Sequence, residues 1–201
     1  MIKNTEKRFP SQKMKIKRVL NLEELQGIKT LQQANLKTEL TEQEQSQEGF
    51  VTAVYSLDFL KQMHQSCPSI VCVDSENKVI GYALVTTQET RSEHPLLESL
   101  FATIDEQEFG GKLLKPSKYV VVGQLCVSKD HRGQGIAQKM YSFFRTSLSN
   151  HYEYCVTDVD VANTNSLKTH LAAGFEVFHQ FSYGGSAWNL VIWDWNNLTK
   201  G

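Results

Sequence analysis

A glycine-containing turn stands between a strand and a helix in the middle of the chain. The segment Gln124–Ala137 reads QLCVSKDHRGQGIA, so an apolar strand ends at Val127 and a helix opens after Gly135. The first amides of a helix have no intrahelical acceptor, and the helix dipole favours an anion beside them. Gly133 and Gly135 lack a Cβ atom, so the backbone can approach a phosphate closely. The turn is typical of a phosphate-binding site; a simple strand-to-helix connection is the alternative.

Two common phosphate motifs are excluded by the residues that follow the turn. The dinucleotide fingerprint needs Gly-x-Gly-x-x-Gly, and Gln138 stands where the third glycine would be. A P-loop needs a Gly-Lys-Ser/Thr ending, which is absent. Lys129, Arg132 and Lys139 are close in sequence and could add charge-assisted contacts to an anion.

Two motifs together resemble those of the GNAT superfamily of N-acetyltransferases. The run Arg132–Ala137 (R-x-x-G-x-A), after Leu125–Val127, resembles the acetyl-CoA motif of that family. The run Asn163–Phe175 (N-x-x-S-x-x-x-H-x-x-x-G-F) resembles its second motif. The two motifs follow one another in the family's helix–strand–helix order, and the resemblance extends from about residue 15 to residue 195. The pair is far more specific than either motif alone.

The resemblance implies an α/β fold with one domain and a mixed, strongly twisted central sheet that has helices on both faces. Two parallel neighbouring strands of this sheet, ending at Val127 and near Asp160, are expected to splay apart. The implied enzyme is an acyltransferase that carries an acetyl group from acetyl-CoA to a primary amine by direct attack. A non-catalytic domain that binds or senses acyl-CoA is the alternative function.

The same resemblance implies where acetyl-CoA would bind. The pantetheine arm would pair with the backbone of Leu125–Val127, the pyrophosphate would lie on the amides of residues 133–138, and Asn163 would face the pantetheine. The implied cofactor-binding residues are Leu125, Cys126, Val127, Arg132, Gly133, Gln134, Gly135, Ile136, Ala137, Gln138 and Asn163.

His170 is the implied catalytic residue, and it departs from the commoner family pattern. Most members carry Tyr at this place, where it protonates the leaving thiolate of CoA; some, including phosphinothricin acetyltransferase-like enzymes, carry His. Imidazole titrates near neutral pH and can serve as a general acid. A helix histidine that packs in the core or bonds a carbonyl is the alternative.

The general base is left open by the sequence. Asp158 and Asp160 alternate with valines, so both lie on one face of the predicted strand that approaches the cleft. Either carboxylate could accept the proton of the amine, and either could instead pair with a cation or cap the following turn. Cys126 lies beside the predicted thioester site, but direct attack in the resembling family disfavours an acyl-cysteine.

Hydrophobic periodicity predicts the elements that position these residues. Strands are predicted at residues 16–20, 70–73, 79–85, 119–127, 154–161, 176–183 and 187–195. Helices are predicted at residues 22–35, 95–107, 136–148 and 166–173, with shorter ones after Thr41 and Ser56.

Residues 1–13 are expected to be a flexible segment and residues 14–198 the acetyltransferase domain. The domain carries a helical insert at about residues 91–118, whose helix is expected to end at Gly110–Gly111. Residues 36–55 and the acidic insert are expected to select the acceptor, although a solvated helix face explains the same charges.

Composition narrows the partners and the compartment. The chain has 201 residues and a formal net charge of −1, which favours neither nucleic acid nor an anionic membrane. Four cysteines without a Cys-x-x-Cys pair, and no apolar run of spanning length, favour a reduced cytoplasmic protein. Six scattered histidines show no metal-ligand spacing, so no metal is expected. The expected partners are acetyl-CoA and an amine acceptor of unspecified size, with the chain a monomer or homodimer.

Overall fold

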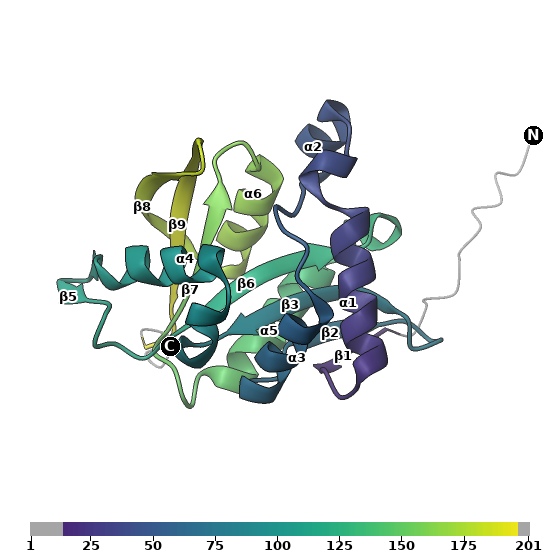
Figure 1. The fold of residues 1–201 in the computed structure, drawn as a ribbon, viewed down its shortest axis with the longest axis horizontal. Coiled ribbons are helices and arrows are strands. Elements are labelled where there is room, and N and C mark those ends of the chain that lie inside the picture. Colours follow the sequence, from purple (N-terminus) through teal and green to yellow (C-terminus); the bar gives the residue numbers. More distant parts are fainter. Residues whose placement is uncertain (1–13, 197–201) are drawn as a thin grey trace, which may run out of the picture.

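The computed structural model describes residues 14–196, so the predictions for residues 1–13 and for residues beyond 196 lie outside it (Figure 1). The main strands are β1 (Lys15–Arg18), β2 (Ile70–Val73), β3 (Val79–Thr86), β6 (Tyr119–Val127), β7 (Tyr154–Asp160), β8 (Glu176–Tyr183) and β9 (Ser186–Asp194). A small hairpin consists of β4 (Glu108–Phe109) and β5 (Lys112–Leu113). The α-helices are α1 (Leu22–Ala34), α2 (Glu42–Glu48), α3 (Leu57–Ser66), α4 (Pro95–Asp105), α5 (Ile136–Leu148) and α6 (Thr164–Ala173). Short 3₁₀ helices are η1 (Lys37–Glu39), η2 (Gln88–Glu93) and η3 (Lys129–His131).

The seven main strands form one mixed sheet in the order β1-β2-β3-β6-β7-β9-β8 (Figure 1). The β6–β7 pair is parallel, and the other neighbours in this sheet are antiparallel. One apolar cluster joins α1, α3 and α4 to one face of the sheet, through residues such as Ile28, Leu60 and Phe101. A second cluster joins α5 and α6 to the other face. The predicted mixed sheet with helices on both faces is therefore confirmed.

Helix α5 lies behind the glycine turn because its apolar residues recur every fourth position. Ile136, Met140, Phe144 and Leu148 are all buried, with at most 2% of each side chain exposed. Residues four apart on a helix lie on one face, so this stripe packs against the sheet. The packing fixes the direction of the helix, and its amino end therefore points at the space beyond β6.

The sheet opens into a fork between β6 and β7. Tyr119–Val121 of β6 pair with Tyr154–Val156 of β7, and the later residues of the two strands do not pair with each other. At the point of divergence, the hydroxyl of Thr157 donates a hydrogen bond to the carbonyl of Val122 at 2.7 Å. The bond satisfies a carbonyl that the neighbouring strand no longer reaches. The predicted splay of the parallel neighbours thus lies where the resemblance put it.

A bulge in β6 accompanies the fork. Leu84 pairs with Gln124 and Val85 pairs with Val122, which leaves Gly123 as an extra residue in the ladder. A Cβ at Gly123 would collide with the hydroxyl oxygen of Thr86, so any larger residue there would force the Thr86 side chain to move. The extra residue bends β6 and helps to direct Gln124 and Leu125 away from β7.

The insert between β3 and β6 is part of the core. Leu97, Leu100, Phe101 and Ile104 of α4 are buried against the first apolar cluster. The helix ends at Asp105, and Gly110–Gly111, both with positive φ, form the turn of the β4–β5 hairpin. The expectation that these glycines end the helix is therefore wrong: a two-residue turn of a hairpin also favours left-handed backbone, which the sequence alone did not distinguish.

No helix within residues 14–196 has both the length and the apolar character that crossing a bilayer requires.

All four cysteines are free, and Cys72, Cys126 and Cys155 are buried in the sheet. Trp193 and Trp195 belong to the second apolar cluster.

Candidate functional site

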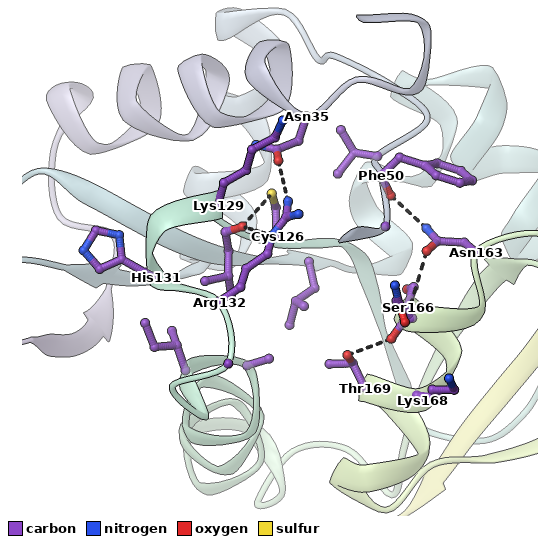
Figure 2. Close-up of a pocket in the computed structure, with 18 of the residues that line it drawn as sticks. Asn35, Phe50, Cys126, Lys129, His131, Arg132, Asn163, Ser166, Lys168 and Thr169 are labelled. Atoms are coloured by element: carbon purple, nitrogen blue, oxygen red, sulfur yellow. Dashed lines mark hydrogen bonds between the residues drawn. The ribbon is translucent and has the colours of Figure 1, made fainter. Parts of the chain in front are cut away.

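A cavity of about 660 Å³ lies at the fork, between the turn before α5 and the start of α6 (Figure 2). It is lined by Asn35, Gly49, Phe50, Val51, Leu125, Cys126, Val127, Lys129, His131, Arg132, Gly133, Gly135, Ile136, Ala137, Gln138, Asn163, Asn165, Ser166, Lys168 and Thr169. Of the predicted cofactor-binding residues, Gln134 does not line this cavity, and its side-chain amide lies 3.4 Å from the carbonyl of Asp130. The structure therefore gathers the other predicted residues around one space.

The glycine turn has the geometry of an anion cradle. Gly133 and Gly135 have φ of 73° and 71°, a left-handed backbone that favours glycine. A Cβ added at either residue would meet no atom within 4 Å, because both positions face open space. Gly135 is the N-cap of α5 and supplies no side-chain cap. The first amides of the helix are thus left for a ligand, and the helix dipole favours a negative one.

The cations beside the turn brace it against the rest of the cleft. The guanidinium of Arg132 donates to the carbonyl of Val127 at 3.0 Å and to the side-chain oxygen of Asn35 at 2.6 Å. Lys129 forms an ion pair with Glu44 of α2 at 2.6 Å. Arg132 lines the larger cavity, as a cofactor-binding residue would, and its guanidinium also ties the turn to β6 and to the end of α1, as Figure 2 shows for Asn35.

Asn163 ties the opposite side of the cleft to the same region. Its side-chain oxygen accepts a hydrogen bond from the amide of Ser166 and caps α6, while its amide nitrogen donates to the carbonyl of Phe50 at 2.9 Å. Lys37 adds an ion pair to Asp160 at 3.1 Å. The segment 35–51 therefore spans the fork: Arg132 holds its start at Asn35, Lys129 holds Glu44 within it, and Asn163 of the α6 cap holds Phe50 near its end.

A smaller cavity of about 70 Å³ adjoins the large one. The two share Phe50, Val51, Leu125, Asn163 and Ser166 in their linings. The smaller cavity is also lined by Thr52, Gly123, Gln124, Thr157, Asp158, Val159, Asp160, His170 and Trp188. It therefore lies inside the fork, at the place where the residues of β6 and β7 stop pairing.

His170 lies on the wall of the smaller cavity and is 4% exposed. Its Nδ1 lies 2.7 Å from the carbonyl oxygen of Ser166, and the rings of Tyr141 and Phe175 pack against it. A carbonyl only accepts, so Nδ1 carries the hydrogen, and neutral His170 has an unprotonated Nε2. Burial lowers the pKa of His170 to about 4. At neutral pH the imidazole is uncharged, with a lone pair on Nε2.

The structure distinguishes the two carboxylates that the sequence left equivalent. Asp160 pairs with Lys37 and accepts a hydrogen bond from the amide of Ala162 at 2.9 Å, so it has the two structural roles foreseen as alternatives. Asp158 lines the smaller cavity, and burial raises the pKa of Asp158 to about 6. A carboxylate with a raised pKa can accept a proton near neutral pH.

Asp158 and His170 reach the smaller cavity from opposite faces of the sheet. Asp158 pairs with Leu190, a member of the cluster under α1 and α4, whereas α6 carries His170 on the other face. Side chains of directly paired residues share a face, so Asp158 belongs to the α1–α4 side. The gap between β6 and β7 lets both groups line one space.

Burial raises the pKa of the Cys126 thiol to about 11, so the thiol stays protonated near neutral pH. A protonated thiol is a poor nucleophile. Within residues 14–196, no group of three or more His, Cys, Asp or Glu side chains is arranged to hold a metal ion.

Comparison with known families identifies this arrangement. The sequence model described as the acetyltransferase (GNAT) family matches residues 33–175. The chain belongs to the GNAT acetyltransferase family. It is accordingly an acyltransferase, and acetyl transfer is the chemistry of the family's site. A search among curated proteins finds no match.

Solved structures of GNAT acetyltransferases share the fold at low sequence identity. A GNAT-family acetyltransferase from Streptococcus agalactiae is 15% identical, with a TM-score of 0.62, and the match covers 90% of this chain and 95% of that one. The putative acetyltransferase YncA from Salmonella typhimurium, solved with acetyl-CoA, is 16% identical, with a TM-score of 0.60 and coverage of 92% and 95%. The ribosomal-protein-S18-alanine N-acetyltransferase from Escherichia coli is 9% identical, with a TM-score of 0.59 and coverage of 90% and 94%.

Sequence reasoning missed a group of buried polar residues beside the smaller cavity. Gln32 of α1 is fully buried and bonds to Gln124 of β6. The available signal was a glutamine within the apolar stripe of a helix, next to Leu31 and Ile28. A polar residue on a buried face needs partners, but the sequence does not say which ones.

Proposed function

We propose that this GNAT acetyltransferase transfers an acetyl group from acetyl-CoA to a primary amine by direct attack. The observation that best supports this proposal is the pair of adjoining cavities at the fork. The larger one ends at the glycine turn, whose geometry fits a pyrophosphate, and the smaller one holds Asp158 and His170. Two structural neighbours add support from their own chemistry: one was solved with acetyl-CoA, and another is an N-acetyltransferase for an alanine of a ribosomal protein.

The fit of acetyl-CoA rests on residues of the larger cavity. The amides of residues 135–138 and the bare Cα atoms of Gly133 and Gly135 would hold the pyrophosphate. The strand Leu125–Val127 borders the cavity where the pantetheine would run toward the fork. Bound there, acetyl-CoA supplies the activated thioester carbonyl.

Asp158 and His170 would divide the proton transfers between them. An amine acceptor arrives as an ammonium ion, and Asp158 would accept its first proton, which makes the nitrogen nucleophilic. As the nitrogen attacks, Nε2 of His170 would accept its second proton and then donate it to the departing sulfur. Atoms balance, because acetyl-CoA and the ammonium yield an amide, CoA thiol and one proton lost to solvent through Asp158.

The experiment that tests this function is a panel of primary amines, amino acids and short peptides incubated with the protein and acetyl-CoA. We expect amine-dependent release of CoA thiol and a product whose mass has increased by one acetyl group. An alcohol panel of matched size is the control and should release no thiol beyond the slow hydrolysis seen without acceptor. A domain that only binds acyl-CoA would bind the cofactor and yield no product with any amine, and that result would overturn the proposal.

A further inference from the structure

A closed ring of hydrogen bonds, buried or partly buried, connects β6 to the extended segment that follows α2. The amide of Tyr55 donates to the side-chain oxygen of Gln32 at 3.1 Å, and the side-chain nitrogen of Gln32 donates to the side-chain oxygen of Gln124 at 2.9 Å. The side-chain nitrogen of Gln124 donates to the carbonyl of Ala53 at 3.0 Å. Because Ala53 and Tyr55 are two residues apart, these three bonds close on one stretch of backbone.

The orientation of both glutamine amides is fixed by their backbone partners. The Tyr55 amide only donates and the Ala53 carbonyl only accepts, so neither side chain can be flipped without losing a bond. The hydroxyl of Tyr82 donates a further hydrogen bond to the side-chain oxygen of Gln124 at 2.6 Å. The ring therefore joins α1, β3, β6 and residues 53–55 in one arrangement.

The ring also holds the backbone of Tyr55, whose side chain lies near enough to Asp158 to feel its charge. The Tyr55 side chain packs against Phe59 and His94. Burial and the nearby charge of Asp158 both raise the pKa of Tyr55, so its phenol stays neutral. Gln124 itself lines the smaller cavity and directly follows the bulge at Gly123. The same two amides thus connect the strand at the fork to the residues that directly follow Phe50–Thr52 of the cavity lining.

We propose that Gln32 and Gln124 are positioning residues for the acceptor: by holding residues 53–55, they fix the adjoining Phe50–Thr52 as a wall of the smaller cavity. The inference rests on the proposed function, because it assigns the smaller cavity to the acceptor amine. A fixed wall confines the amine beside the carboxylate and limits the entry of water. Burial raises the pKa of Asp158, and a fixed wall beside it would help to keep the carboxylate away from water.

The test compares Gln32→Met and Gln124→Met with wild type and with Gln180→Met. Methionine keeps the length of the side chain and removes the amide. Gln180 is the matched control, because it also donates to a side-chain amide oxygen, that of Asn189 at 2.6 Å, and lines neither cavity. Steady-state kinetics with one good acceptor, calorimetric titration with acetyl-CoA and thermal unfolding are measured for each protein.

We expect kcat/KM for the acceptor to fall by about tenfold to a hundredfold in the Gln32 and Gln124 variants, mostly through KM. The Kd for acetyl-CoA should stay within about twofold, since the phosphate turn is unchanged. In a plot of kcat/KM against pH, the acid limb should move to lower pH. Water admitted beside Asp158 would lower the pKa of this carboxyl group from about 6. Gln180→Met should change neither the limb nor KM.

A purely structural role gives a different result: a smaller active fraction would lower kcat at every pH and leave the acid limb in place. An unmoved limb and unmoved KM in a folded variant would overturn the proposal, as would a loss of acetyl-CoA affinity equal to the loss for the acceptor. Tyr82→Phe removes one hydrogen bond to Gln124 and keeps the aromatic ring in place. If a methionine variant fails to fold, Tyr82→Phe should shift KM and the acid limb in the same direction by a smaller amount. Failure of the proposed function is distinct, because wild type would then acetylate no amine at all.

Discussion

At the scale of single residues, the hydrogen bond from Nδ1 of His170 to the carbonyl of Ser166 determines how the histidine can act. It fixes the tautomer, and burial lowers the pKa of the imidazole to about 4. A neutral imidazole of this tautomer presents a lone pair to the cavity, so His170 must accept a proton before it can donate one. The tyrosine that most family members carry would start with its proton in place. The two residues would therefore reach the same final step from different starting states.

Replacing His170 by alanine should lower kcat by about 10²- to 10⁴-fold, the usual range for losing a group that transfers protons. Acetyl-CoA affinity should change little, because the phosphate turn is distant from the imidazole in the chain and lines the other cavity. His170→Tyr should restore part of the rate, since a phenol can donate to sulfur. His179→Ala, a change on β8 outside both cavities, is the control. Near-wild-type turnover of His170→Ala would remove His170 from the chemistry.

Asp158→Asn should abolish the acid limb of the kcat/KM profile. The carboxylate is a base only when ionised, so with a pKa of about 6 the wild-type rate should fall as pH drops through that value. An asparagine cannot titrate, and the residual rate should be low and flat across this range. Asp160→Asn keeps the oxygen that accepts from Ala162 and should retain the limb. A limb that persists in Asp158→Asn and disappears in Asp160→Asn would reverse the assignment.

At the scale of elements, α4 and the β4–β5 hairpin that follows it are held firmly to the rest of the fold. Arg91 pairs with both Glu98 and Asp105, and the hydroxyl of Tyr119 donates to Asp105 at 2.7 Å. Glu98 and Asp105, two acidic residues of the insert that was expected to select the acceptor, are thereby paired within the insert. Neither cavity is lined by residues of α4, β4 or β5. The insert supports the sheet beside the fork, and we propose that the acceptor contacts Phe50–Thr52 instead, which line the smaller cavity.

Leu100→Ala and Leu96→Ala test this support with the same substitution on one helix. Leu100 is 5% exposed and Leu96 is 37% exposed. Leu100→Ala should lower the free energy of unfolding by about 2–5 kcal/mol, because it leaves a cavity in the core. Leu96→Ala should stay within about 0.5 kcal/mol. Chemical denaturation measures both, and equal small effects would show that α4 is a detachable lid.

The elements themselves were predictable from local pattern, whereas their long-range contacts were not. The stripe of α5, the Asn163 cap and the Gly174 end of α6 each follow from residues within one or two helical turns. The partner of Arg132 is Asn35, and the partner of Gln124 is Gln32; each pair is separated by more than ninety positions. Periodicity carries no information about such pairs.

The difference between Asp158 and Asp160 has the same origin. Both alternate on one face of β7, and only the position of Lys37, brought in by the segment that follows α1, makes one of them a structural residue. The sequence therefore gave two candidates where the structure leaves one facing the cavity without that partner.

At the scale of the whole molecule, the fork joins a place for an anion to a place for proton transfer. Parallel pairing of β6 and β7 ends after three positions, and the segment 35–51 spans the opening above it. One side of the fork leads to the amino end of α5 and the other to Asp158. A ligand with phosphates at one end and a reactive carbonyl at the other fits this layout. The central claim is that the glycine turn holds those phosphates.

Calorimetric titration of acetyl-CoA into wild type, Gly135→Ala and Gly185→Ala tests that claim most directly. Gly135 and Gly185 have φ of 71° and 79°, and a Cβ at either meets no atom within 4 Å, so the two substitutions impose similar backbone strain. Only Gly135 lines the larger cavity; Gly185 lies in the β8–β9 turn. We predict that Gly135→Ala weakens acetyl-CoA binding by about tenfold or more, because its methyl group and the strained turn displace the amides from the phosphates. Gly185→Ala should bind as wild type does. A folded Gly135→Ala protein that binds acetyl-CoA with wild-type affinity would contradict the account.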